Sequence, residues 1–186
     1  MTKLFKYAGV IASVALIAFG TGAIVVGFNG RDRVHNDLAR EQIVGTPDSS
    51  IPNQLVNTGA KAEAFAKVMR KHTLEATGGQ TYAQMPRYLG KNGKPTNDEK
   101  AAALDPKSGK PVDNPARNIW VTETALTTAL NTSYFAESVA NFAIVMGFAL
   151  LITGGGFLIV ALRILPRTSE ESETEPLTAG KVAIES

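Results

Sequence analysis

Residues 7–28 read YAGVIASVALIAFGTGAIVVGF and contain no charged side chain. As an α-helix this run would be roughly 33 Å long, enough to cross the roughly 30 Å hydrocarbon core of a bilayer. Residues 138–162, SVANFAIVMGFALLITGGGFLIVAL, are also uncharged and slightly longer. Uncharged apolar runs of this length predict two transmembrane helices rather than the buried core helices of a soluble protein.

The flanks of the first run leave a second interpretation open. Lys3 and Lys6 precede it, as in a secretory signal peptide, and the small residues 20–23 resemble a cleavage site. However, the apolar run continues through AIVVGF and is longer than the core of an ordinary signal peptide. We therefore interpret residues 7–28 as an uncleaved anchor, with a cleaved signal peptide as the alternative.

The charges next to the two runs predict the orientation in the membrane. Lys3 and Lys6 precede the first run, and Arg163 and Arg167 follow the second. Short basic segments tend to stay in the cytoplasm, whereas a long connection is translocated largely regardless of its charge. We expect a plasma-membrane protein with both termini cytoplasmic and residues 29–137 extracytoplasmic.

The chain therefore divides into five predicted segments. They are a cytoplasmic N-terminus (1–6), a transmembrane helix (7–28), an extracytoplasmic region (29–137), a second transmembrane helix (138–162) and a disordered cytoplasmic tail (163–186). The tail is acidic, rich in Ser and Thr, and nearly devoid of large apolar residues, a composition typical of disorder. The chain has no Cys, which excludes disulfides and thiolate metal sites.

Two helices are predicted within the extracytoplasmic region. The first, at about 58–77, has Asn57 or Thr58 as its N-cap and Gly78 just after its end. Its residues Phe65, Val68, Met69 and His72 have the spacing of one buried stripe. The second, 114–137, starts at Asn114 and Pro115 and continues into the second span as one helix of about 50 residues. We expect Trp120 in it to be a packing residue rather than an interface anchor, and the first helix to hold the outer part of this long helix.

Residues 83–113 are rich in Gly, Pro and Lys and predict loops. Thr96 and Glu99 match a capping box for one short helix ending at Leu104. In the spans, Ala18 with Gly22 and Ala143 with Gly147 match the small-xxx-small pattern of closely packed membrane helices. The predicted fold class is thus an all-α membrane protein with two antiparallel transmembrane helices and a mostly helical insert.

Residues 70–82, RKHTLEATGGQTY, contain the elements of a metal or catalytic site. The simpler interpretation is a helix end, with Gly78 as the stop and Glu75 pairing with His72 three positions away. A metal site would need more ligands from other helices, and the only other His is His35. We predict no catalytic, cofactor-binding or metal-binding residues.

The chain resembles a family of small two-span membrane proteins from actinobacteria and related bacteria. The resemblance rests on residues 72–85, HTLEATGGQTYAQM, and 105–144, DPKSGKPVDNPARNIWVTETALTTALNTSYFAESVANFAI. It extends from about residue 60 to the second span and includes the general layout of the first span. The function of these proteins is not established, and many carry an automatic label of aromatic ring-opening dioxygenase.

The small net charge of +2 and the mixture of basic with acidic residues argue against nucleic-acid binding, and the uncharged spans argue against an ion path. We expect a non-catalytic interaction or structural component of the cell envelope or of a membrane complex. Its partners would be the lipid bilayer and other membrane or envelope proteins, or a second copy, without any cofactor. The alternative is a metal-dependent, dioxygenase-like enzyme that uses His35, His72 and either Glu75 or Glu123.

Overall fold

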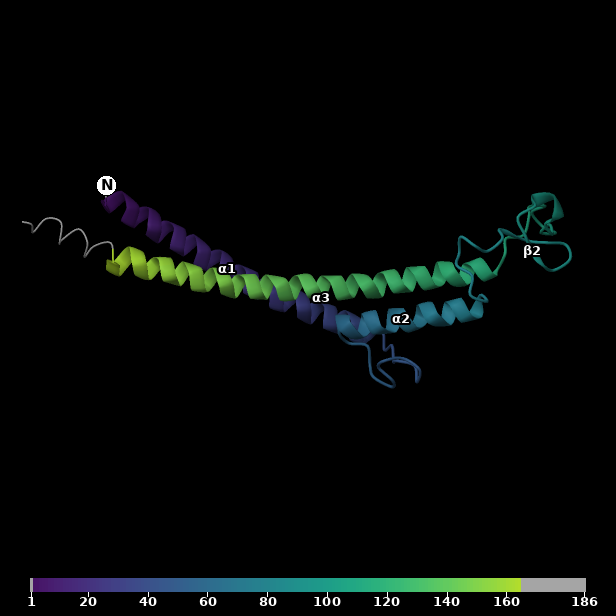
Figure 1. Ribbon diagram of the computed structural model, residues 1–186, viewed down its shortest axis with the longest axis horizontal. Helices are drawn as coiled ribbons and strands as arrows, with labels where there is room; N and C mark the ends of the chain where they lie inside the picture. Colours follow the sequence, from purple (N-terminus) through teal and green to yellow (C-terminus); the bar gives the residue numbers. More distant parts are fainter. Residues whose placement is uncertain (1, 165–186) are drawn as a thin grey trace, which may run out of the picture. The chain divides into compact units, whose positions relative to one another are not determined.

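The computed structural model describes residues 2–164, which are mostly helical, at 66 % of the chain. The described elements, in chain order, are α1 (Thr2–Arg40), α2 (Gly59–Ala76), β1 (Tyr88–Leu89), β2 (Pro95–Thr96), the 3₁₀ turn η1 (Glu99–Ala101), α3 (Ala116–Ile159) and the π-helical turn η2 (Val160–Ile164) (Figure 1). The chain forms two compact units. Among the described residues, the apolar unit contains residues 2–29 and 140–164, and the polar unit is Gly30–Val139.

The two predicted apolar helices are present. α1 has 39 residues and α3 has 44, and both are long and apolar enough to cross a membrane by length and composition. As predicted, α3 runs without a break from the polar region through the second apolar run. α1 extends beyond the predicted end at residue 28 and stops at Arg40. The predicted tail lies outside the described residues from residue 165 onward.

In the apolar unit, α1 and α3 pack antiparallel along small residues that recur every seven positions. These residues are Ser13, Gly20 and Gly27 in α1, and Ala140, Gly147, Gly154 and Ala161 in α3. A Cβ added to Gly27 would lie 2.8 Å from the Ala140 carbonyl oxygen, and one added to Gly147 would lie 2.7 Å from that of Gly20. A seven-residue period keeps one stripe of each helix facing the other, so the two backbones touch over about four turns.

The predicted small-xxx-small pair Ala18 and Gly22 does not lie at the contact between α1 and α3. Both residues are exposed, and a Cβ added to Gly22 would meet no atom within 4 Å. Successive helical residues are rotated by about 100°, so Gly22 points about 200° away from the contact residue Gly20. In the second predicted pair, Gly147 does lie at the contact, while Ala143 is half-buried beside it.

The polar unit has its core between α2, α3 and the end of α1. The core residues are Leu38, Val56, Ala62, Ala66 and Leu130. α2 lies beside α3 in the opposite direction, because Gly59 at its start approaches Tyr134 and Arg70 near its end lies over Trp120 (Figure 1). This confirms the prediction that α2 holds the outer part of α3.

The ends of α2 follow the predicted signals. The Thr58 hydroxyl accepts a hydrogen bond from the Lys61 N–H at 3.3 Å and caps the first turn. At the other end, Gly78 has φ +62°, and the Gly79 N–H donates to the Leu74 carbonyl at 2.7 Å. Only glycine adopts this left-handed conformation without strain, which is why the helix ends here.

Residues 85–114 form a small β structure that the sequence did not predict. β1 pairs antiparallel with β2, and isolated bridges join Tyr88 to Asp113 and Leu104 to Pro111. Met85, Tyr88 and Ala102 are buried within it. These contacts fix the chain between α2 and α3, so this segment is a compact connection with defined backbone hydrogen bonds.

The predicted helix from Thr96 to Leu104 is wrong, because only the turn η1 forms there. Asp98 caps η1 by accepting from the Lys100 N–H at 3.0 Å, and the Thr96 hydroxyl instead accepts from the Asp98 N–H. The chain after η1 pairs with β1 instead of continuing as a helix, since the Ala103 N–H donates to the Leu89 carbonyl. Tertiary pairing has therefore replaced the local helical preference.

Candidate functional site

The residues proposed for a metal-dependent enzyme, His35 and His72 with either Glu75 or Glu123, do not converge. His35 pairs with Glu137, His72 pairs with Asp48, and the buried Glu123 accepts a hydrogen bond from the Thr124 hydroxyl at 3.3 Å. Within the described part of the chain, no group of three His, Asp or Glu side chains could hold a metal ion. The geometry therefore gives no metal centre within residues 2–164.

Glu137 connects three segments of the polar unit. Its Oε1 lies 2.9 Å from Nε2 of His35 at the end of α1, and its Oε2 accepts from the Gly59 N–H at the start of α2. The side chains of His35 and Glu137 are 26 % and 14 % exposed. The carboxylate thus satisfies one of the N–H groups that an α-helix leaves unpaired in its first turn.

The environment of Glu137 favours its charged form. Burial acts to raise the pKa of Glu137, but the hydrogen bonds from His35 and from the Gly59 N–H outweigh it, with a smaller contribution from the Arg31 charge. The pKa of the carboxyl group therefore lies below its ordinary value of 4.5. An ionised Glu137 at neutral pH is a stabilising contact between helices.

A second polar cluster lies on the exposed side of α2. Asp48, from the loop after α1, accepts from Lys71 Nζ and lies within hydrogen-bond distance of His72 Nε2, both at 2.9 Å. The predicted pairing of His72 with Glu75 is wrong, because Glu75 faces Lys71 at 3.9 Å instead. The hydrogen bonds from Lys71 and His72 hold the pKa of Asp48 well below its usual range. This cluster fastens the loop to α2.

The outer face of α3 carries an open apolar groove. Its lining residues are Tyr82, Trp120, Val121, Thr124, Ala125 and Thr128, around a volume of about 480 Å³. Trp120 is buried beneath it, and its Nε1–H donates to the Gln80 carbonyl at 3.0 Å. This confirms that Trp120 is a packing residue, and it fixes the chain around Tyr82 against α3. We call this surface the α3 groove.

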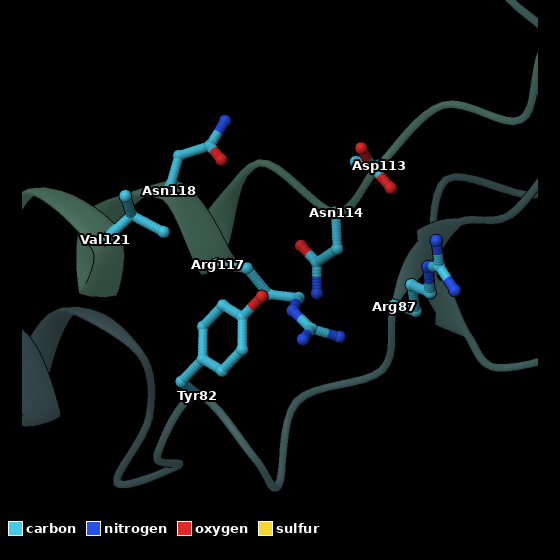
Figure 2. A pocket seen from close by; sticks show the side chains of 7 residues that line it. All are labelled: Tyr82, Arg87, Asp113, Asn114, Arg117, Asn118 and Val121. Atoms are coloured by element: carbon cyan, nitrogen blue, oxygen red, sulfur yellow. The ribbon is translucent and has the colours of Figure 1, made fainter.

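A more polar pocket lies next to the α3 groove, at the start of α3. Figure 2 shows its lining, which consists of Tyr82, Arg87, Asp113, Asn114, Arg117, Asn118 and Val121. Its volume is about 290 Å³. The Arg117 guanidinium lies over the Tyr82 ring, 4.0 Å from the ring centre. We call this the arginine pocket.

The sequence analysis missed two features, the contacts of Glu137 and the stacking of Arg117 on Tyr82. Glu137 carries a visible signal, because it is the last charged residue before the uncharged run 138–162. Arg117 and Tyr82 are separated by a hairpin whose strands have only two residues each, so no sequence periodicity predicts that they meet.

Comparison of the chain with protein-family models, with curated proteins and with solved structures finds no match in any of the three. Function is therefore inferred from the contacts of the described residues.

Proposed function

We propose that this chain is an integral membrane protein whose polar unit serves as a non-catalytic interaction or structural module for other membrane or envelope proteins. The observation that carries the proposal is the α3 groove, an open apolar surface beside a buried Trp. Apolar grooves that expose aromatic and small side chains are typical of sites that bind another protein. Both His residues are engaged in contacts within the fold, His35 with Glu137 and His72 with Asp48.

The apolar unit supports the membrane location. Only 11 % and 17 % of the residues in the most apolar parts of α1 and α3 are buried, whereas a core helix of a soluble protein is mostly buried. Large side chains such as Phe19 and Ile152 are 74 % and 77 % exposed. Lipid would cover such surfaces without the cost of exposing them to water.

We also propose membership of the two-span actinobacterial family that the sequence resembles, without its dioxygenase label. A ring-opening dioxygenase of the usual type holds Fe(II) with two His and one carboxylate. Among residues 2–164, His35 and His72 belong to separate clusters, and neither cluster has three possible ligands. No contact of the described residues favours the enzyme alternative.

The proposed topology predicts a specific cleavage pattern. Protease added to intact cells should cleave within residues 29–137, and tags at both termini should stay protected until the membrane is permeabilised. The exposed loops at residues 91–94 and 106–110 offer accessible backbone. Cleavage of the tags in intact cells, with the central region untouched, would reverse the topology.

The interaction role predicts a discrete partner that contacts the α3 groove. Crosslinking in native membranes should give one defined product, and Ala125→Lys should reduce its yield about tenfold, because a charge would be buried in an apolar contact. The matched control is Thr122→Lys, an exposed position of the same helix that does not line the groove. A lone monomer in every preparation, or equal losses for both variants, would contradict the proposal.

A further inference from the structure

We propose that the arginine pocket binds a phosphate group. This inference does not depend on the protein partner proposed above, because it rests on Arg87 and Arg117, which do not line the α3 groove, although Tyr82 and Val121 line both surfaces. The pocket volume of about 290 Å³ is near the lower end of ordinary ligand sites, which limits the ligand to a small molecule or a headgroup.

Arg117 is held in position to contact a ligand. Its guanidinium stacks on the Tyr82 ring, and the segment that carries Tyr82 is fixed by the Trp120 hydrogen bond to Gln80. Figure 2 shows the guanidinium beside the Tyr82 ring and below Asn114. Stacking occupies the face of the guanidinium and leaves its edge, with the N–H donors, available.

Backbone contacts hold the segment that carries Arg87 against the start of α3, and the Arg87 guanidinium lies over the Tyr88 ring, 5.1 Å from the ring centre. The Asn114 N–H donates to the Arg87 carbonyl at 2.8 Å, and the Asn114 side chain donates to the Pro86 carbonyl at 2.9 Å. Asn114 itself is 3 % exposed and also accepts from the Ala116 N–H. The start of α3 and the chain before β1 are thereby connected, and Arg87 and Arg117 line the same pocket.

The two arginines lack an anionic partner within residues 2–164. The ion pairs among these residues involve Arg33 and Arg40 but neither Arg87 nor Arg117. Asp113 lines the same pocket, yet its carboxylate pairs with neither guanidinium, and in Figure 2 it turns away from Arg117. Two guanidiniums on one pocket repel each other, and an added anion would relieve that repulsion.

The arrangement suits phosphate better than carboxylate. A carboxylate has two oxygens, and one arginine fork satisfies both of them. Phosphate has three or four oxygens and a charge of about −1 to −2, so two arginines from different segments can each contact it. The Asp113 carboxylate lines the same pocket and disfavours ligands of high negative charge.

The test is calorimetric titration of the full chain in uncharged detergent at constant ionic strength. The probes are inorganic phosphate, glycerol phosphate, water-soluble dihexanoyl phosphatidic acid, whose headgroup is a phosphomonoester, and, as the carboxylate comparison, acetate. We expect saturable binding of phosphate probes with a dissociation constant of about 1 mM or lower. Tighter binding of the two soluble phosphates identifies a free phosphate compound, whereas tighter binding of the lipid identifies a headgroup.

Variants assign the binding to the pocket. Arg117→Gln and Arg87→Gln should each weaken phosphate binding about tenfold, and Arg117→Lys should lie in between because it keeps the charge but loses the fork. The matched control is Arg70→Gln, since Arg70 also lies over an aromatic ring, at 5.2 Å from the centre of Trp120, but outside the pocket. Unchanged thermal unfolding of the exposed Arg87→Gln variant excludes misfolding as the cause.

Three results would overturn the inference. They are absence of saturable phosphate binding, acetate binding as tight as phosphate binding, and an equal loss of binding in Arg70→Gln.

Discussion

Replacing Gly147 with leucine is expected to separate α1 from α3 in the apolar unit. A Cβ at this position would lie 2.7 Å from the Gly20 carbonyl oxygen and 2.6 Å from Cγ1 of Ile24. The first of these atoms belongs to the backbone, so no change of rotamer relieves the clash. Overpacking of a close contact typically costs 1–3 kcal/mol, and we expect about 3 kcal/mol here because the helices must move apart along the whole stripe.

An engineered disulfide measures this separation in a chain that has no Cys of its own. A Cβ at Gly9 lies 3.1 Å from the Cβ of Ala161, so Gly9→Cys with Ala161→Cys should crosslink after slight relaxation. Adding Gly147→Leu should abolish most of the crosslinking and lower the thermal unfolding temperature in detergent. Gly22→Leu is the matched control, because its side chain would enter open space. Equal effects of the two leucines would show that the seven-residue stripe is not the contact.

This stripe marks the limit of what the sequence predicts. Length and lack of charge are properties of one segment, so the two apolar helices were predictable from residues 7–28 and 138–162 alone. The face through which they touch depends on both helices at once. Glycine is frequent in both runs, and two different spacings of small residues were available, of which only the seven-residue spacing makes the contact.

In the polar unit, too, features of a single segment were predictable and contacts between segments were not. The ends of α2 were predictable because Thr58 and Gly78 act on their own helix. The β structure was not, because its strands have two residues each and Tyr88 also bridges to Asp113. His35 and Glu137 are 102 positions apart, so their pairing is a consequence of tertiary structure that no local pattern encodes.

Replacing Glu137 with alanine should be the most damaging change in the polar unit. The substitution removes the acceptor of the Gly59 N–H and the partner of His35, both of which are partly buried. Hydrogen bonds to a charged group contribute about 1.5–3 kcal/mol each, so we expect a loss of about 3 kcal/mol in the free energy of unfolding. Glu75→Ala is the matched control, because its exposed carboxylate lies 3.9 Å from Lys71 and should cost under about 0.5 kcal/mol. Trp120, the sole Trp and a buried one, reports unfolding of this unit by fluorescence.

The pH dependence separates the charge of Glu137 from its packing. Because the pKa of Glu137 is lower in the folded chain than its ordinary value of 4.5, the unfolded state binds the proton more readily. The stabilisation is therefore complete above pH 4.5 and is lost as the pH falls through the lowered pKa. Asp48 and Asp105 also have lowered pKa values and titrate in the same acidic range, so the informative quantity is the difference in unfolding free energy between variants.

Glu137→Gln keeps an oxygen acceptor for the Gly59 N–H but has no carboxylate to protonate. Its unfolding free energy should therefore fall less steeply between pH 5 and pH 2 than that of the unmodified chain. Parallel pH profiles for the two proteins would show that folding does not lower the pKa of Glu137.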